Sequence, residues 1–284
     1  MMAGKLYVVA TPIGNLTELS PRAVEILQSV ERIACEDTRT SSVLLRRFGI
    51  DTPLMACHKF NEEAVTAQFI DIMLGGHDVA LISDAGTPSV SDPGAFLVAA
   101  AVDAGIEVLP VTGSCALIAA LSVSGFSGLS FGFYGFLPKE KKKIAELLTR
   151  ADGDSMPIAV FYLSPHRLRE TLELVAAHWD DAALCLCNDL TKLHERMYRG
   201  SPQIVMQAIE QNAKAGRGEY VLVVQKPPRQ EERDEMPLSY EARLVDDIVR
   251  HGGTLKDAVA RLSKEGLARN GLYDASLRVK GLSG

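Results

Sequence analysis

The feature that most constrains the fold is a regular alternation, within residues 1–117, between short apolar runs and longer segments with helical periodicity. Each apolar run is followed by a polar cluster and then by apolar residues spaced three and four apart. The apolar runs are residues 5–10, 33–35, 54–57, 79–82 and 107–111. Strands that alternate with helices form parallel sheets, because each helix returns the chain to the start of the next strand. The alternation therefore predicts an α/β fold with a parallel sheet.

The polar clusters that follow these runs predict a binding site. They occupy residues 11–15, 36–39, 58–62, 83–94 and 112–114. In a parallel sheet, the carboxyl ends of the strands share one edge, and ligands bind in the crevice outside that edge. We therefore expect the five clusters to converge there.

The cluster at 83–94 is the richest in groups that contact ligands. It holds two carboxylates, two glycines, two prolines and several hydroxyls. Glycine lets a ligand approach the backbone closely. Asp92 and Pro93 also predict a helix start, with Asp92 as the N-cap and Pro93 at the first helical position.

The rest of the chain predicts a second α/β domain at 118–226, a linker at 227–237 and a small helical module at 238–284. In the second domain we expect strands at 131–135, 158–162, 183–188 and 220–225, with helices that begin at Pro138, Ser164-Pro165 and Ser201-Pro202. Prolines and charges are typical of a linker. The module has helical patterns at 238–250, 254–263 and 266–279. Such spacing is compatible with a helix-turn-helix, and equally with an appendage that packs or dimerises.

Composition excludes several classes of protein. The chain is 47% hydrophobic and 23% charged, as in soluble globular proteins, and we expect a cytoplasmic location without a membrane partner. Its net charge of −6 argues against wholesale coating of nucleic acid but allows a local basic surface. The five scattered cysteines complete no ligand set, so no metal site is expected. A P-loop is absent, and so is a dinucleotide-binding glycine motif after the first strand.

Several side chains at the predicted edge are candidates for proton transfer. Glu36 and Asp37 are adjacent carboxylates, and His58 follows the next strand. Arg39 lies close to the two carboxylates, so a structural ion pair is the alternative interpretation. A single histidine is more often a surface or core residue than a catalytic one. Spacing alone leaves these alternatives open.

Nine motifs spread along the chain resemble one known family. The N-terminal motifs read YVVATPIGNL at 7–16, CEDTR at 35–39 and SDAGTPSVSDPG at 83–94. The others are YGFLP at 134–138, FY at 161–162 with SPHRL at 164–168, LTK at 190–192 with Glu195, GEYVLVV at 218–224, KDAVA at 256–260 and NGLY at 270–273. Together they resemble the ribosomal RNA small subunit methyltransferase I family, which belongs to the tetrapyrrole-methylase superfamily.

The resemblance implies a homodimeric enzyme that transfers a methyl group from S-adenosylmethionine to a cytidine ribose 2′-hydroxyl in the decoding region of 16S rRNA, in the 30S subunit. The cofactor would lie between the two α/β domains. The cofactor-binding residues that the resemblance implies are Pro12, Gly14, Ser83, Asp84, Ala85, Gly86, Pro88, Asp92, Gly113, Ser114, Ala116, Phe161 and Tyr162. Carboxylates suit the amino group, the ribose hydroxyls and the sulfonium charge, and small residues leave room for adenosine.

The same resemblance suggests how the catalytic residues act. A ribose hydroxyl is a poor nucleophile until a base takes its proton. We expect Glu36, Asp37 or His58 to be that base, with Arg39 and Asn61 orienting the substrate.

RNA contacts are expected from Lys139, the lysines at 141–143 and the basic C-terminal helices, although a solvated helix face is the alternative. Phe60 or Tyr134 could stack on a splayed base, or could belong to the core. Three positions depart from the family pattern, since Asn188-Asp189 replaces an Arg-Glu pair and Leu163 replaces a Glu.

Two other functions remain open at this stage. A tetrapyrrole methyltransferase of the precorrin type would share the cofactor cleft, but should lack the helical module and the motif at 36–39. A nucleic-acid-binding regulator would rest on the helical module alone.

Overall fold

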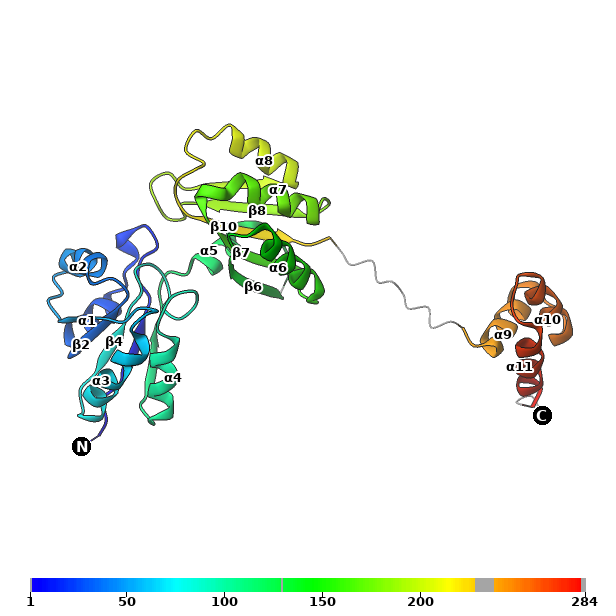
Figure 1. The fold of residues 1–284 in the computed structure, drawn as a ribbon, viewed down its shortest axis with the longest axis horizontal. Coiled ribbons are helices and arrows are strands. Elements are labelled where there is room, and N and C mark those ends of the chain that lie inside the picture. The colour runs from blue at the N-terminus through cyan, green and yellow to red at the C-terminus, as the bar shows by residue number, and fades with distance from the viewer. Residues whose placement is uncertain (1, 129, 228–237, 282–284) are drawn as a thin grey trace. The chain divides into compact units, whose positions relative to one another are not determined.

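The computed structural model describes residues 2–128, 130–227 and 238–281. The chain divides into two compact units, Met1–Pro227 and Pro228–Gly284. The larger unit contains two five-stranded sheets with helices, and the smaller unit is helical (Figure 1). The linker predicted at 227–237 lies outside the described residues except for Pro227.

The first sheet is fully parallel, as predicted, with the strand order β3-β2-β4-β1-β5. Its strands are β1 (Leu6–Val9), β2 (Arg32–Cys35), β3 (Leu54–Ala56), β4 (Val79–Leu81) and β5 (Val108–Val111). Its helices are η1 (Leu16–Glu18), α1 (Pro21–Ser29), α2 (Thr38–Arg47), α3 (Glu62–Leu74) and α4 (Ala95–Asp103). One face of the sheet is covered by α1 and α2 and the other by α3 and α4. Burial on both faces explains why the strands read as continuous apolar runs.

The second sheet also alternates with helices along the chain, but its strands run in mixed directions. Its order is β6-β7-β10-β8-β9; only the β6–β7 pair is parallel. Its strands are β6 (Phe131–Phe136), β7 (Ile158–Leu163), β8 (Ala183–Asn188), β9 (Arg196–Gly200) and β10 (Tyr220–Gln225). Four of these strands were predicted. The sequence pattern missed β9, because this edge strand has the polar sequence RMYRG rather than an apolar run.

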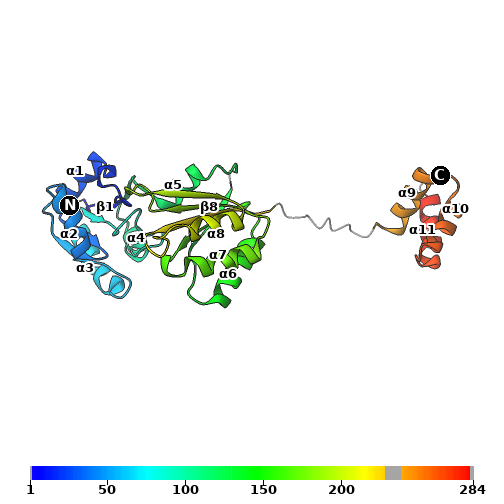
Figure 2. The same cartoon turned by 90° about the horizontal axis from the view of Figure 1, so that it is seen from above.

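Helices also cover both faces of the second sheet. They are α5 (Ala116–Ser124), α6 (Lys141–Gly153), η2 (Pro165–Arg167), α7 (Leu168–His178) and α8 (Pro202–Glu210). Figure 2 shows α6, α7 and α8 on one side and α5 on the other, in agreement with the two apolar clusters. The boundary expected after residue 117 falls inside α5, which packs on the second sheet. The helix expected at Pro138 begins later, at Lys141, because Leu137 still donates a backbone hydrogen bond to Tyr162.

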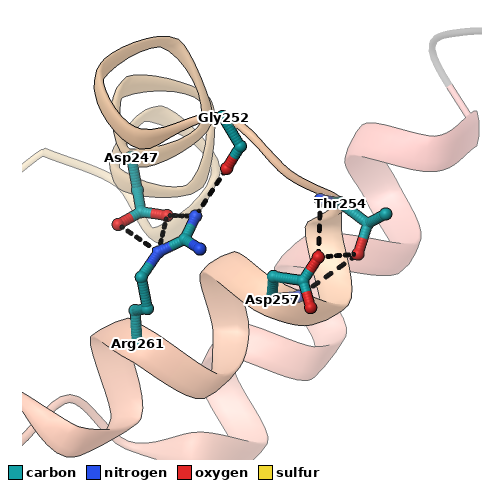
Figure 3. Close-up of polar contacts among 5 residues, drawn as sticks. All are labelled: Asp247, Gly252, Thr254, Asp257 and Arg261. Carbon is teal, nitrogen blue, oxygen red and sulfur yellow. Dashed lines mark hydrogen bonds and ion pairs between the residues drawn. The ribbon is translucent and has the colours of Figure 1, made fainter.

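The smaller unit contains three helices among its described residues: α9 (Tyr240–His251), α10 (Leu255–Lys264) and α11 (Arg269–Gly281). They enclose an apolar core of Leu244, Ala258, Leu262, Leu272 and Ala275. Thr254 and Asp257 form a capping box at the start of α10, and Arg261 pairs with Asp247 while it donates a hydrogen bond to the Gly252 carbonyl (Figure 3). The three predicted helices are therefore confirmed.

Candidate functional site

The polar clusters that follow the parallel strands converge at one edge of the first sheet, as predicted. Thr11 and Gly86 pair through two backbone hydrogen bonds of 2.9 and 3.0 Å, which join the first cluster to the loop at 83–94. The Asp37 N–H lies 3.4 Å from Asp84 Oδ1, and Thr87 Oγ1 donates to the Ser114 carbonyl over 3.2 Å. The loop at 83–94 is thus the centre of the edge.

A cavity of about 370 Å³ opens beside this loop and has walls from both sheets. The first-sheet side contributes Ile13, Asp84, Ala85, Gly86, Thr87, Val90, Ser91 and Asp92. The second-sheet side contributes Cys115, Ala116, Phe136, Tyr162, Leu163, Ser164, Pro165, Leu190, Gly218, Glu219, Tyr220 and Val221. Six of the thirteen implied cofactor residues line it, namely Asp84, Ala85, Gly86, Asp92, Ala116 and Tyr162. Such a volume is typical of a small-molecule site.

Asp84 and Asp92, which line the cavity, form an acidic cluster with Glu36, which does not line it. Burial raises the pKa values of Asp84 and Asp92 above 3.8 and that of Glu36 above 4.5. Repulsion by Asp84 raises the pKa of Glu36 further, while His58 opposes the increase. A cationic ligand would relieve both the repulsion and the cost of burying these charges.

Asp37 and Arg39 form the structural ion pair that the sequence left open. Asp37 is the N-cap of α2: its Oδ1 accepts a hydrogen bond from the Arg39 N–H over 2.8 Å, and the two side chains pair at 2.7 Å. Hydrogen bonds from Arg39 lower the pKa of Asp37 to about 2. A carboxylate with so low a pKa is a weak proton acceptor.

The helix start predicted at Asp92 and Pro93 is wrong. α4 begins at Ala95, its N-cap is Gly94 with φ 121°, and Asp92 is no cap. Instead, Glu62 at the start of α3 accepts hydrogen bonds from the Gly94 and Phe96 N–H groups, at 2.9 and 3.0 Å. Because Glu62 satisfies these backbone donors from another helix, the Asp92 carboxyl is left to face the cavity.

Two predicted residues of the 58–62 cluster have clear local contacts. The Asn61 side chain accepts a hydrogen bond from the His58 N–H at 2.7 Å and donates one to the Ala56 carbonyl at 3.0 Å, so it stabilises its own turn. His58 Nδ1 accepts a hydrogen bond from the Phe60 N–H at 3.3 Å. The Phe60 side chain is 93% exposed.

Phe161, another implied cofactor residue, does not line the cavity. Neighbouring residues on a strand face opposite sides of the sheet, and only Tyr162 faces the cavity. Phe161 is fully buried on the other face, where it stacks on Tyr134 and packs near Trp179. This contact also makes Tyr134 a packing residue, with its hydroxyl bonded to Asp154 at 2.7 Å.

The other implied cofactor residues are not among those that line the cavity. Pro12, Ser83 and Pro88 are buried, and Ser83 Oγ donates to the Gly86 carbonyl at 3.2 Å. A Cβ atom on Gly113 would lie 3.1 Å from that of Ala10, which indicates close packing. Ser114 donates to Glu18 at 3.0 Å, and Gly14 lies against Lys192.

Leu190 and residues 218–221 line the cavity but were not among the predicted site residues. They belong to motifs that carried the family resemblance, which was the available signal. No local pattern places them at the first sheet, because their contact with it joins residues far apart in the chain. The lysines at 141–143, expected to bind phosphate, each pair with a glutamate: Glu170, Glu146 and Glu140, respectively.

Comparison with known proteins identifies the class. Residues 5–203 match the family model for Tetrapyrrole (Corrin/Porphyrin) Methylases. A uroporphyrin-III-C-methyltransferase from Thermus thermophilus has a TM-score of 0.53 at 22% identity, covering 78% of this chain and 94% of that one. A diphthine synthase has a TM-score of 0.60 at 13% identity, covering 78% and 89%. The fold is thus that of a tetrapyrrole-type methylase.

Curated relatives then identify the family. Proteins named ribosomal RNA small subunit methyltransferase I match from Pseudomonas aeruginosa at 41% identity (100% of both chains), from Synechocystis at 39% (98% of this chain, 99% of the relative) and from Escherichia coli O157:H7 at 36% (98% and 96%). The chain belongs to the ribosomal RNA small subunit methyltransferase I family.

Proposed function

We propose that this chain transfers a methyl group from S-adenosylmethionine to the ribose 2′-hydroxyl of a cytidine in the decoding region of 16S rRNA. The observation that carries the proposal is the similarity, over its full length, to proteins named as small-subunit rRNA methyltransferases. The acidic cavity between the two sheets supports the cofactor part of the proposal.

The residues of the cavity fit this cofactor. S-adenosylmethionine, when bound, supplies a methyl group on a positively charged sulfur. Asp84 and Asp92 provide the negative charge and hydrogen-bond acceptors that its cationic and hydroxyl groups require. Ala85, Gly86 and Ala116 leave space for its adenosine, against the half-buried ring of Tyr162.

We favour Glu36 as the base because of its electrostatic environment. It belongs to the acidic cluster beside the cavity, and burial makes its carboxylate a better proton acceptor. Asp37 is engaged by Arg39 and has a pKa of about 2. In this proposal Glu36 accepts the ribose proton, and His58 is the alternative base.

Phe60 supports an RNA-binding role for the same edge. Its exposed ring lies 6.2 Å from the His58 ring, on the loop that borders Glu36. An exposed aromatic ring can stack on an unpaired base, a contact worth about 1–3 kcal/mol. The neighbouring residue Lys59 is also exposed, so its ammonium group can contact an RNA phosphate.

The test is methyl transfer to defined RNA. The protein is incubated with tritiated S-adenosylmethionine and 30S subunits from cells that lack the activity, and the label is mapped in 16S rRNA. We expect label on one decoding-region cytidine, in a dinucleotide that resists alkali because its 2′-oxygen is blocked. Label on a base instead of the ribose, or no label on 16S rRNA, would refute the proposal.

We also propose that the enzyme is a cytoplasmic homodimer. No helix among the described residues is long and apolar enough to span a bilayer. Sedimentation equilibrium should give about twice the 30.7 kDa mass of the chain. A monomer at micromolar concentration would contradict the dimer.

A further inference from the structure

The segment at 11–15 connects the loop that carries Asp84 and Asp92 to the second sheet. At one end, Thr11 pairs with Gly86 through two backbone hydrogen bonds. At the other end, the Asn15 N–H donates to Thr191 Oγ1 over 3.1 Å, and Ile13 packs in an apolar cluster formed mainly by residues of the second sheet and α5. The segment therefore contacts both walls of the cavity.

Gly14 sets how closely the two sides approach. A Cβ atom at this position would lie 2.5 Å from Lys192 Cγ and 3.0 Å from both the Leu190 carbonyl oxygen and Thr191 Oγ1. Two of these three neighbours are the backbone and a short side chain of a braced loop. A Cβ atom here would require the Lys192 side chain to shift and the Leu190 carbonyl and Thr191 Oγ1 to yield by a few tenths of an ångström.

The loop at 189–192 is held in an unusual conformation. Asp189 and Thr191 have φ values of 50° and 65°, which non-glycine residues adopt only when the surrounding structure holds them there. The Asp189 N–H donates to the Glu219 carbonyl at 2.9 Å, and the Glu219 N–H donates to Asp189 Oδ1 at 3.2 Å. Lys192 Nζ joins the two carboxylates, at 3.1 Å from Asp189 and 3.0 Å from Glu219.

This braced loop borders the cavity directly. Leu190 and Glu219 line it from the second-sheet side, and Ile13 and Gly86 line it from the first-sheet side. A shift at the contact between 13–15 and 189–192 would therefore change the distance between the walls. Asp189, which replaces a glutamate of the family pattern, is one of the bracing residues.

We propose that the contact between residues 13–15 and 189–192 is a positioning contact that fixes the separation of the two cavity walls for cofactor binding. Gly14 and Thr191 are its central positioning residues. The inference rests on the proposed cofactor and assigns to Gly14 a role in packing the two walls, in place of direct contact with the ligand.

The experiment measures the affinity for S-adenosylhomocysteine by calorimetry in Gly14→Ala, Thr191→Val and Thr191→Ser. Val has the shape of Thr but cannot accept the Asn15 hydrogen bond, whereas Ser can. Gly216→Ala is the matched control, because a Cβ atom there meets no other atom within 4 Å. We expect Gly14→Ala and Thr191→Val to weaken binding about tenfold, or ~1.4 kcal/mol, with Thr191→Ser and Gly216→Ala close to wild type.

A structural role elsewhere would lower stability without changing affinity. The positioning role instead predicts that KM for S-adenosylmethionine rises in Thr191→Val while kcat at saturating cofactor stays near wild type. Wild-type affinity in folded Thr191→Val would overturn the positioning role, even if Gly14→Ala failed to fold. A wild-type protein that bound no S-adenosylhomocysteine would refute the cofactor proposal, and the positioning role with it. Failure of the positioning role alone would differ, because the wild type would still bind.

Discussion

At the scale of single residues, the environment of each acid separates groups that look equivalent in sequence. Glu36 and Asp37 are neighbours, yet burial raises the pKa of Glu36 while hydrogen bonds from Arg39 lower that of Asp37 to about 2. Adjacent acids with pKa values moved in opposite directions suit different tasks. Glu36 suits proton transfer, whereas Asp37 caps α2.

Glu36→Gln should reduce the single-turnover rate by about 10²–10⁴-fold, because the amide cannot take the ribose proton. In the wild type, protonation of Glu36 at low pH should remove the proposed base. The pKa that governs the loss of rate on the acidic side should therefore lie above the ordinary glutamate value of 4.5. The raised pKa also means that ionised Glu36 destabilises the folded state at neutral pH. The melting temperature of Glu36→Gln should therefore equal or exceed that of the wild type.

Quenched-flow rates across pH and a thermal melt measure both effects. Asp37→Asn is the matched comparison. It should lower the melting temperature, because Asp37 caps α2, but should leave the single-turnover rate close to wild type. A wild-type rate in Glu36→Gln would exclude Glu36 as the base and would leave His58 as the candidate.

At the scale of elements, a side chain from one helix caps another. The Glu62 carboxylate bonds the Gly94 and Phe96 N–H groups and so ties the loop that bears His58 to the loop that bears Asp92. Glu62→Ala should destabilise the protein by about 1 kcal/mol, as loss of a helix cap does, and should weaken S-adenosylhomocysteine binding.

Glu62→Gln retains a carbonyl acceptor and should restore most of both losses. Urea titration and calorimetry measure the two quantities. Equal behaviour of the Ala and Gln variants would mean that charge, rather than the hydrogen bonds, is what Glu62 contributes.

The terminal helices offer a second prediction at this scale. Arg261 pairs with Asp247, whose side chain is 5% exposed, and holds the pKa of that carboxyl below 3.8 (Figure 3). A depressed carboxyl pKa stabilises the fold above its unfolded pKa, and this stability is lost as the pH falls through the folded pKa. Arg261→Ala should therefore lower the melting temperature of these helices at pH 7, since it leaves a buried charge unpaired.

Arg250→Ala removes an exposed pair with Asp246 on α9 and serves as the control, with little expected change. Melts monitored by circular dichroism at pH 7 and near pH 3 compare the variants. The difference between Arg261→Ala and wild type should shrink at the lower pH, and an undiminished difference would assign the effect to packing.

At the scale of the whole molecule, the cavity between the two sheets and the terminal helices belong to different compact units. All residues that line the cavity fall within Met1–Pro227. Residues 238–284 carry eight Lys or Arg and six Asp or Glu, which gives them a net charge of +2 in a chain of net charge −6. Phosphate contacts are therefore expected from residues 238–284 more than from the paired lysines of α6.

A protein that ends at residue 227 should bind S-adenosylhomocysteine as the full chain does, but should bind 30S subunits more weakly. Its affinity should also depend less steeply on salt, because fewer phosphate contacts release fewer counterions. Filter binding from 50 to 200 mM salt measures both quantities. An unchanged slope would leave the terminal helices with a packing or dimerising role.

Much of the architecture could be predicted from sequence because it depends on local periodicity. The strand and helix alternation determined the parallel first sheet, and parallel strands necessarily bring their polar ends to one edge, so the cluster around Asp84 followed. The helix start predicted at Ser201 was also a local signal, and its side chain accepts a hydrogen bond from the Ile204 N–H.

Tertiary structure alone decided the contacts between residues distant in the chain. The face on which Phe161 lies, the replacement of Asp92 by Glu62 as the cap of α4, and the approach of Gly14 to Lys192 all depend on how separate elements pack. Local sequence carries no signal for these choices, because hydrogen bonding and van der Waals contact between elements are settled only once the elements meet. The sequence by itself thus determined the family, the parallel first sheet and the convergence of its polar clusters, while packing decided which of those side chains face the cavity.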